Sequence, residues 1–434
     1  MDLKIFDRME SEVRGYIRSF PVIFSQARGS LLIDESGREY IDFFSGAGTL
    51  NYGHNNPVFK EKLLEYLASD GVVHGLDMAT SAKKRFLETF ERVLLKPRNW
   101  RYTLQFTGPT GTNAVEAALK IARQVKGRPN IISFTHGFHG VSGGSLAATA
   151  NVKFRGAAGY SLGNTTFMPY DGYFGPDVDT IAYLERMLED PSSGLDKPAG
   201  VIVETVQGEG GVNVATLRWL KELEKLCHRH DMLLIVDDIQ VGCGRTGSFF
   251  SFESAGLRPD IITLSKSLSG FGLPMSLVMM KPELDVWKPG AHSGTFRGNN
   301  LAFVTAAQAL DSYWASDAFS TEVQRKERIV RDWLENLAHS YPNAGLAARG
   351  RGLIQGLVST ATPELSNQIA SKAFERGVVI ETSGAHDEVL KLLPALTIED
   401  ELLMQGLEVI EASVADALGQ TQPSARVLKF GGKR

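Results

Sequence analysis

The sequence predicts an α/β protein, and three observations in its central region support this prediction. Apolar runs of the length of buried strands recur there: 130–134 (NIISF), 200–205 (GVIVET), 233–238 (LLIVDD) and 261–266 (IITLSK). These runs are apolar throughout instead of at every second residue, as in a parallel sheet covered on both faces. A helical pattern at 215–231 separates the second run from the third. We therefore expect a mostly parallel central sheet.

The helical patterns each have one apolar face. In 215–231 we expect this face to comprise Leu217, Leu220, Leu223 (or Glu224) and Cys227. In 106–124 it comprises Val115, Ala118, Leu119 and Ala122. Further helices are predicted at 59–69, 81–95, 301–316 and 320–342.

The two ends of the chain predict a smaller α+β domain. Residues 29–43 alternate apolar runs around the turn DESG and are typical of a hairpin. A second unit of strand and helix patterns occupies 350–360, 367–377 and 378–383. We expect a large domain at 55–315, a small domain built from 1–54 and 316–420, and a disordered tail at 421–434.

The composition argues against several classes of partner. The 434 residues include 46 Lys and Arg against 50 Asp and Glu, and the net charge of −4 gives no reason to expect nucleic acid or a membrane surface as a partner. Neither of the two cysteines, Cys227 and Cys243, lies in a Cys/His cluster, so no metal site is expected. No apolar stretch approaches a membrane span, and the charged N-terminus does not resemble a signal peptide. We expect a soluble cytoplasmic protein.

Ionisable residues end three of the predicted strands. Glu204, Asp237 and Lys266 each follow an apolar run. Because ligands bind outside the carboxyl ends of strands in open α/β sheets, these groups are expected to converge. A desolvated lysine is nucleophilic and can form a Schiff base, and an acid beside a ring nitrogen completes what pyridoxal 5′-phosphate requires. A surface loop is the alternative explanation for each residue taken alone.

The turn before 106–124 is a candidate phosphate site. Thr110, Gly111 and Thr112 open the helix, where backbone N–H groups and the helix dipole favour an anion. An ordinary capped helix start is the alternative. No GxxxxGK[ST] or GxGxxG pattern is present, which disfavours nucleotide binding.

The segment HGFHG (136–140) offers an aromatic side chain for a flat ring. Phe138 lies in the middle of this segment and could stack on the ring of a cofactor. The alternative is that Phe138 is an ordinary residue of the hydrophobic core. His136 and His139 lack further ligands at metal-binding spacing, so we do not expect a metal there.

Several blocks together resemble class III (omega-type) pyridoxal-phosphate aminotransferases. These are ETVQGEGG (204–211), DDIQVGCGRTG (237–247), LSKSLSGFGLP (264–274), HSGTFRGNNLA (292–302) and GREYIDFFSGAGTLNYGHNNP (37–57). The resemblance covers about residues 15–415. It implies the type I fold of pyridoxal-phosphate-dependent transferases and a homodimer, or a larger homo-oligomer, with a shared active site.

The resemblance also implies roles for individual residues. Lys266 would form the Schiff base and Asp237 would pair with the pyridine nitrogen of the cofactor. Gln240 would bind the phenolic oxygen, Phe138 would stack on the ring, and Gly111 and Thr112 would bind the phosphate, as would Thr295 of the neighbouring subunit. Glu209 would lie near the substrate, and Glu204 would support the floor of the site.

A narrower resemblance is to the diaminobutyrate–2-oxoglutarate aminotransferases of the ectoine pathway. It implies transfer of the amino group of L-glutamate to L-aspartate 4-semialdehyde. Another ω-amino-acid or ornithine-type transamination, an aminomutase reaction, and a non-catalytic regulatory member remain alternatives. The chain departs from the broader family at Asp238, Val141 and Lys391, where glutamate, arginine and arginine are usual. Lys391 is our candidate for the substrate carboxylate, with a solvated surface lysine as the alternative.

Overall fold

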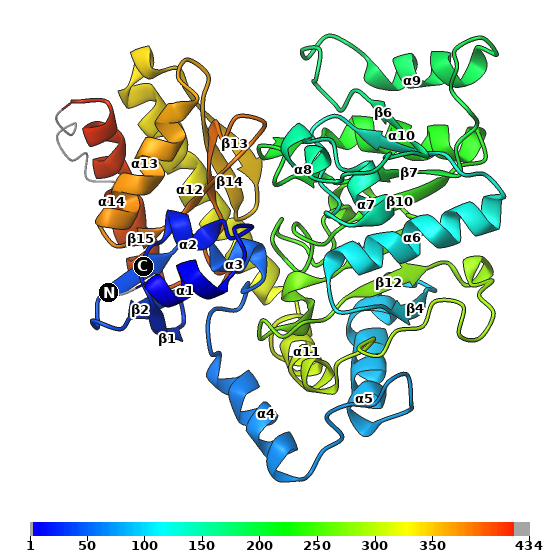
Figure 1. Cartoon of the computed structure of the whole chain (residues 1–434), viewed down its shortest axis with the longest axis horizontal. Helices are drawn as coiled ribbons and strands as arrows, with labels where there is room; N and C mark the ends of the chain where they lie inside the picture. The colour runs from blue at the N-terminus through cyan, green and yellow to red at the C-terminus, as the bar shows by residue number, and fades with distance from the viewer. Residues whose placement is uncertain (1–2, 421–434) are drawn as a thin grey trace.

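A seven-stranded sheet forms the centre of the computed structural model, which describes residues 3–420 (Figure 1). β12 is the one strand of this sheet that runs opposite to the other six, so the sheet is mostly parallel, as predicted. The strand order is β4 (Thr103–Phe106), β12 (Leu277–Met280), β11 (Ile261–Leu264), β10 (Leu233–Asp237), β7 (Gly200–Val203), β5 (Ile131–Phe134) and β6 (Thr165–Met168). The four predicted apolar runs are β5, β7, β10 and β11, and every residue of these strands is buried.

Helices cover this sheet and bury it on both faces. The helix α6 (Gly111–Lys126) buries Val115, Ala118, Leu119 and Ala122, as predicted. The helix α10 (Leu217–Arg229) begins at Leu217, but this side chain is 43% exposed, so its assignment to the apolar face was wrong. Trp219 and Leu226 are buried instead, together with the predicted Leu220, Leu223 and Cys227, because the buried stripe is rotated about the helix axis away from Leu217.

The remaining helices of this region mostly agree with the predicted ranges. The predicted helix at 81–95 changes its hydrogen-bond spacing after Phe90 and continues as a π-helical turn over Glu91–Leu95. The other helices are α4 (Pro57–Ala68), α5 (Ser81–Phe90), α7 (Gly143–Ala148), α8 (Val152–Gly156), α9 (Thr180–Glu189) and α11 (Asn300–Tyr313).

Residues from both ends of the chain build the second part of the structure. The predicted hairpin is present as β2 (Leu31–Asp34) and β3 (Glu39–Asp42), flanked by β1 (Phe24–Arg28) and by β15 (Val378–Val379), which pairs in parallel with β3. A second sheet has the order β13 (Leu346–Arg351), β14 (Ile354–Ser359), β17 (Val389–Leu392) and β16 (Glu381–Ser383). A short hairpin pairs β8 (Val206–Gln207) with β9 (Asn213–Val214).

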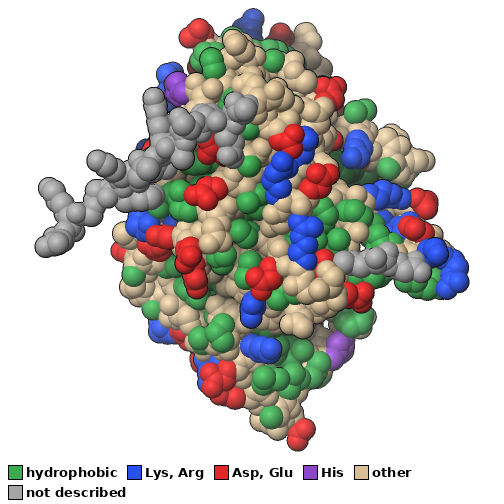
Figure 2. All heavy atoms as spheres, turned by 90° about the vertical axis from the view of Figure 1, so that its left-hand side faces the viewer, with side chains coloured by type: hydrophobic (Ala, Val, Ile, Leu, Met, Phe, Trp, Pro, Cys, Tyr) green, Lys and Arg blue, Asp and Glu red, His purple; other side chains and the backbone are tan. Residues whose placement is uncertain are grey.

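Six helices accompany these sheets: α1 (Lys4–Met9), α2 (Tyr16–Ser19), α3 (Ser45–Gly48), α12 (Ala318–Ser340), α13 (Glu364–Glu375) and α14 (Asp400–Ala417). Figure 1 shows the N-terminal helices beside α13 and α14. Figure 2, turned so that this side faces the viewer, shows acidic and basic side chains interspersed over it. The boundaries at 54/55 and 315/316 remain a prediction, and the predicted tail 421–434 lies outside the described residues. No helix between residues 3 and 420 is both long and apolar enough to cross a bilayer.

A buried arginine ties several of these segments together. The Arg245 side chain is fully buried, and its guanidinium donates to the carbonyl oxygens of Leu353, at 3.0 Å, and Pro394 and to the Asn51 side chain. Burial lowers the pKa of Arg245 to about 9, with a partial offset from Asp42. One cation thus satisfies groups from three distant parts of the chain.

Arg245→Ala is expected to lower the free energy of unfolding by about 3 kcal/mol or more, because it leaves buried acceptors without a donor and opens a cavity. Urea unfolding followed by tryptophan fluorescence measures this loss. Arg101→Ala, at an exposed position, is the control and should change stability little. Equal stability of the two variants would contradict the structural role of Arg245.

Candidate active site

Lys266 lies at the carboxyl edge of the central sheet, just after β11. Its backbone has a φ of +49°, which is uncommon for a residue with a side chain. The ammonium donates to the carbonyl oxygen of Ala47 at 2.8 Å, within the short helix α3. Burial lowers the pKa of Lys266, and the charge of Glu209 only partly opposes this. A lysine with a lowered pKa is a better nucleophile.

Asp237 ends the neighbouring strand β10 and is almost completely buried. One carboxylate oxygen lies 2.7 Å from His139 Nδ1, and the other accepts from Thr263 Oγ1 at 3.0 Å. Burial lowers the pKa of His139, but the hydrogen bond and the charge of Asp237 outweigh it, so the net shift is upward. Sequence reasoning weighed His139 only as a metal ligand and missed this contact.

Glu204 follows β7 and completes the group of strand-end residues. Its Oε2 accepts from the backbone N–H of Phe138 at 2.9 Å, which holds the predicted stacking residue in place. Burial raises the pKa of Glu204 to about 8, with a partial offset from His139. The three predicted strand-end residues are therefore all ordered by contacts at this edge of the sheet, although Glu204 contacts the loop after β5 and not Lys266.

The start of α6 is free to receive an anion. Thr110 precedes the helix but makes no capping hydrogen bond; its hydroxyl bonds Asn113 Oδ1 at 2.8 Å instead. Thr112 Oγ1 lies 2.8 Å from Ser142 Oγ. A Cβ placed on Gly111 would lie 3.0 Å from the Ile239 side chain, so glycine keeps this approach open. The ordinary capped start, which was the alternative explanation, is not what the structure has.

The residues present fit a pyridoxal-phosphate ring. Gln240 Oε1 is buried and has no hydrogen-bond partner among the described residues, while its Nε2 donates to Ala47 O at 3.1 Å and Glu209 Oε1 at 2.8 Å. The amide of Gln240, the buried acid Asp237, the amine of Lys266 and the uncapped helix start are the groups that the phenolic oxygen, ring nitrogen, aldehyde and phosphate of this cofactor require.

Lys391 is not a surface lysine. It lies on β17 with a side chain that is 0% exposed, and its Nζ is 2.7 Å from Glu209 Oε1 and 3.0 Å from Glu381 Oε1. Burial opposes the charge of Lys391, but the two glutamates outweigh it and raise its pKa. Burial likewise opposes ionisation of Glu209, yet Lys391 and Lys266 lower the pKa of Glu209 to about 2.

Glu381 was missed by sequence reasoning, although a signal existed. It ends the apolar run VVIE (378–381), as Glu204 ends GVIVE. Burial raises the pKa of Glu381 to about 7, and the charge of Lys391 only partly offsets this.

Thr295 lies apart from the other predicted residues. Its side chain is exposed, and its carbonyl oxygen lies 3.0 Å from His74 Nε2. The described chain therefore does not bring Thr295 to Lys266.

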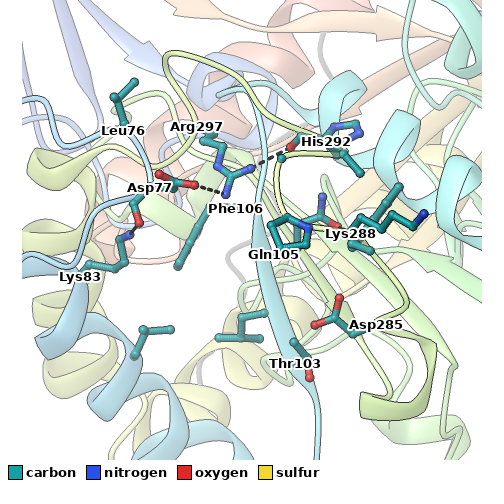
Figure 3. Close-up of a pocket in the computed structure, with 16 residues that line it drawn as sticks. Leu76, Asp77, Lys83, Thr103, Gln105, Phe106, Asp285, Lys288, His292 and Arg297 are labelled. Atoms are coloured by element: carbon teal, nitrogen blue, oxygen red, sulfur yellow. Dashed lines mark hydrogen bonds and ion pairs between the residues drawn. The ribbon is translucent and has the colours of Figure 1, made fainter.

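A separate cavity of about 420 Å³ lies between β4 and the loop around 285–292 (Figure 3). Two of its cationic groups contact Asp77: Arg297 donates to the Asp77 carboxylate at 2.9 Å, and Lys83 donates to the Asp77 backbone carbonyl at 2.8 Å. Neither Lys266 nor Asp237 lines it.

Glu204→Gln is expected to gain stability over the wild type as the pH rises. The folded chain holds a proton on Glu204 up to about pH 8, whereas the unfolded chain releases it near 4.5, so wild-type stability falls between these values by up to about 1.4 kcal/mol per pH unit. Glutamine carries no such proton and retains an oxygen for the Phe138 N–H.

The melting temperatures of both proteins, freed of cofactor, should therefore diverge from pH 5 to pH 8. Glu61→Gln, at an exposed position, is the control. A constant difference between variant and wild type across this range would show that Glu204 ionises normally.

Comparison with known proteins agrees with this geometry. The class-III aminotransferase family model matches residues 14–414. The diaminobutyrate–2-oxoglutarate transaminase of Bordetella parapertussis is 90% identical over 100% of both chains, and that of Halomonas elongata is 58% identical over 96% of this chain and 100% of its own length. The ornithine aminotransferase of Toxoplasma gondii has a TM-score of 0.82 and 27% identity, covering 96% of this chain and 94% of its own.

These matches confirm the predicted fold class and the prediction of a pyridoxal-phosphate-dependent aminotransferase. The family model spans the central sheet and both sheets of the second part of the structure. The chain belongs to the class-III aminotransferase family.

Proposed function

We propose that this enzyme transfers the amino group of L-glutamate to the aldehyde carbon of L-aspartate 4-semialdehyde, which yields 2-oxoglutarate and L-2,4-diaminobutyrate. The observation that carries the proposal is a buried lysine–glutamate pair, Lys391 and Glu209, whose charges act on the amine of Lys266. A cation beside the reactive amine suits substrates that all carry a carboxylate. The relatives at 90% and 58% identity bear the corresponding name.

Six residues would hold pyridoxal 5′-phosphate. Lys266 takes the aldehyde, Asp237 the ring nitrogen and Gln240 the phenolic oxygen; Phe138 stacks on the ring, and the phosphate lies at Gly111 and Thr112. When bound, this cofactor supplies an electron-accepting ring that stores the amino group between the two half-reactions.

Lys266 and Asp237, at the edge of the sheet, would have different roles in the reaction. The lowered pKa of Lys266 lets its amine take the proton from the α-carbon of glutamate and, in the second half-reaction, return one to C4 of diaminobutyrate. The Asp237 carboxylate is held in place by His139 Nδ1, at 2.7 Å, and by the Thr263 hydroxyl, which donates to it at 3.0 Å.

Lys391 would bind a substrate carboxylate, and the Glu209 side chain would move away from Lys391 to make room for it. The Glu209 side chain is 25% exposed and comes from the turn between β8 and β9, whereas Glu381 is held within a strand and is 9% exposed. Glu209 is therefore the partner with room to move.

The functional unit is a homodimer in the cytoplasm, with Thr295 serving the phosphate of the neighbouring subunit. Support comes from an unusual number of exposed apolar side chains on α4 and near Thr295, which a partner subunit would cover. They are Val58, Leu64, Leu67, Val72, Val73, Leu76, Met78 and Phe296. We assign the diaminobutyrate to an ectoine-type pathway.

Incubation of the purified enzyme with glutamate and aspartate semialdehyde should yield diaminobutyrate, detected by mass spectrometry. The Lys266→Ala variant should lose the visible absorbance of the lysine-bound cofactor, and its turnover should fall at least about 10³-fold. Ornithine and 4-aminobutyrate are the alternative donors, the former because of the structural likeness to an ornithine aminotransferase. A clear preference for ornithine over diaminobutyrate in the reverse assay would replace the proposal.

Mixing Lys266→Ala with Thr295→Asp chains should restore activity, since each heterodimer contains one complete site. Random exchange makes half of the dimers mixed with one of two sites intact, so recovery should reach about one quarter of wild-type activity. Each variant alone, also carried through the unfolding and refolding step, is the control. Mixed dimers isolated by two affinity tags that remain inactive would contradict the shared site.

A further inference from the structure

One carboxylate oxygen of Glu381, Oε1, accepts no well-directed hydrogen bond. Glu381 on β16 lies directly across from Lys391 on β17 in the antiparallel pairing of these strands. Its side chain is 9% exposed, and Oε1 forms an ion pair with Lys391 Nζ at 3.0 Å without accepting a well-directed hydrogen bond. Among residues 3–420, the Lys391 ammonium is thus the one cationic group at this oxygen, and it is shared with Glu209.

The other glutamate of the cluster is satisfied. Glu209 Oε1 accepts from Lys391 Nζ at 2.7 Å and from Gln240 Nε2 at 2.8 Å. Native proteins give nearly all buried polar atoms a hydrogen bond, so a buried carboxylate oxygen that accepts none, in a group whose charge acts on Lys266, is a candidate binding site for a ligand. Of the two carboxylate oxygens that contact Lys391, Glu381 Oε1 is the one that accepts no well-directed hydrogen bond.

The charges around Lys391 point to the kind of group that is missing. One lysine lies between two glutamates, so the three groups carry a net charge of −1 when both acids are ionised. The pKa of Glu381 is raised by burial, and this cost would be relieved by a second cation. The group that suits Glu381 Oε1 itself is therefore a cation, whereas a carboxylate suits Lys391.

The substrates of the proposed reaction supply such a cation. Aspartate 4-semialdehyde and 2,4-diaminobutyrate both carry an ammonium and a carboxylate on their α-carbon, away from the reacting C4. Lys391 and Glu381 present the opposite charges as adjacent groups, 3.0 Å apart. A zwitterionic amino-acid head can therefore meet both at once.

We propose that Glu381 is a specificity-determining residue that accepts a hydrogen bond from the α-ammonium of aspartate semialdehyde and diaminobutyrate. This inference rests on the proposed function and deepens it. A substrate such as 4-aminobutyrate, which is diaminobutyrate without the α-amine, leaves Glu381 Oε1 unpaired. Glu381 thereby selects amino acids over simple ω-amines.

The experiment compares diaminobutyrate with 4-aminobutyrate as amino donors to 2-oxoglutarate, in the wild type and in Glu381→Gln. The ratio of the two kcat/KM values should fall about 10- to 100-fold in the variant, because one charge-assisted hydrogen bond is lost with diaminobutyrate only. The change should lie mainly in KM for diaminobutyrate. Glu388→Gln, a neighbouring half-buried glutamate in the turn before β17, is the matched control and should keep the wild-type ratio.

A second measurement needs no turnover. Calorimetric titration of the pyridoxamine-phosphate form, in which an added amine cannot react, should show tighter binding of diaminobutyrate than of 4-aminobutyrate, and the difference should vanish in Glu381→Gln. An unchanged ratio, or an equal loss with both donors, would overturn the inference and leave Glu381 as support for Lys391. A wild type that does not use diaminobutyrate at all would instead overturn the proposed function.

Discussion

Parallel pairing of β7, β10 and β11 is the constraint on which the rest of the site depends. Adjacent parallel strands end at the same edge of a sheet, so the residues that follow them lie close together whatever the conformation of the connecting loops. This edge is buried, and the low polarity there gives each charge a large effect on its neighbours. The lowered pKa of Lys266 and the raised pKa of Glu204 are two consequences of the same burial.

Each charge buried at this edge has a specific compensation. Asp237 has His139, and Lys391 has two glutamates. Removing one member of such a set leaves an unpaired charge, which is why these residues act as groups and why their effects are not additive. Glu381 differs, since its Oε1 is ion-paired with Lys391 but accepts no well-directed hydrogen bond, and the proposed substrate ammonium would supply one.

The N-terminal segment contacts the candidate site as well as the C-terminal strands. The carbonyl oxygen of Ala47 accepts from both Lys266 and Gln240, and Ala47 itself has a φ of +56°. A residue other than glycine in this region is strained, and the strain is maintained by the packing around it. The parallel pairing of β3 with β15 fixes this segment to the C-terminal strands that carry Glu381 and Lys391. This pairing links the segment that contacts Lys266 to the part of the chain that contains the Lys391–Glu381 ion pair.

The sequence alone determined the fold class, the four central strands and the positions of Lys266, Asp237 and Gln240, because apolar runs and their polar ends are local patterns. It also led to the family through contiguous blocks of residues. Only the tertiary structure decided which charges meet: that His139 bonds Asp237, that Lys391 is buried, and that Glu381 lies opposite it. These contacts join residues that lie far apart along the chain or on different strands, and strand register and burial, which create them, leave no local mark in the sequence.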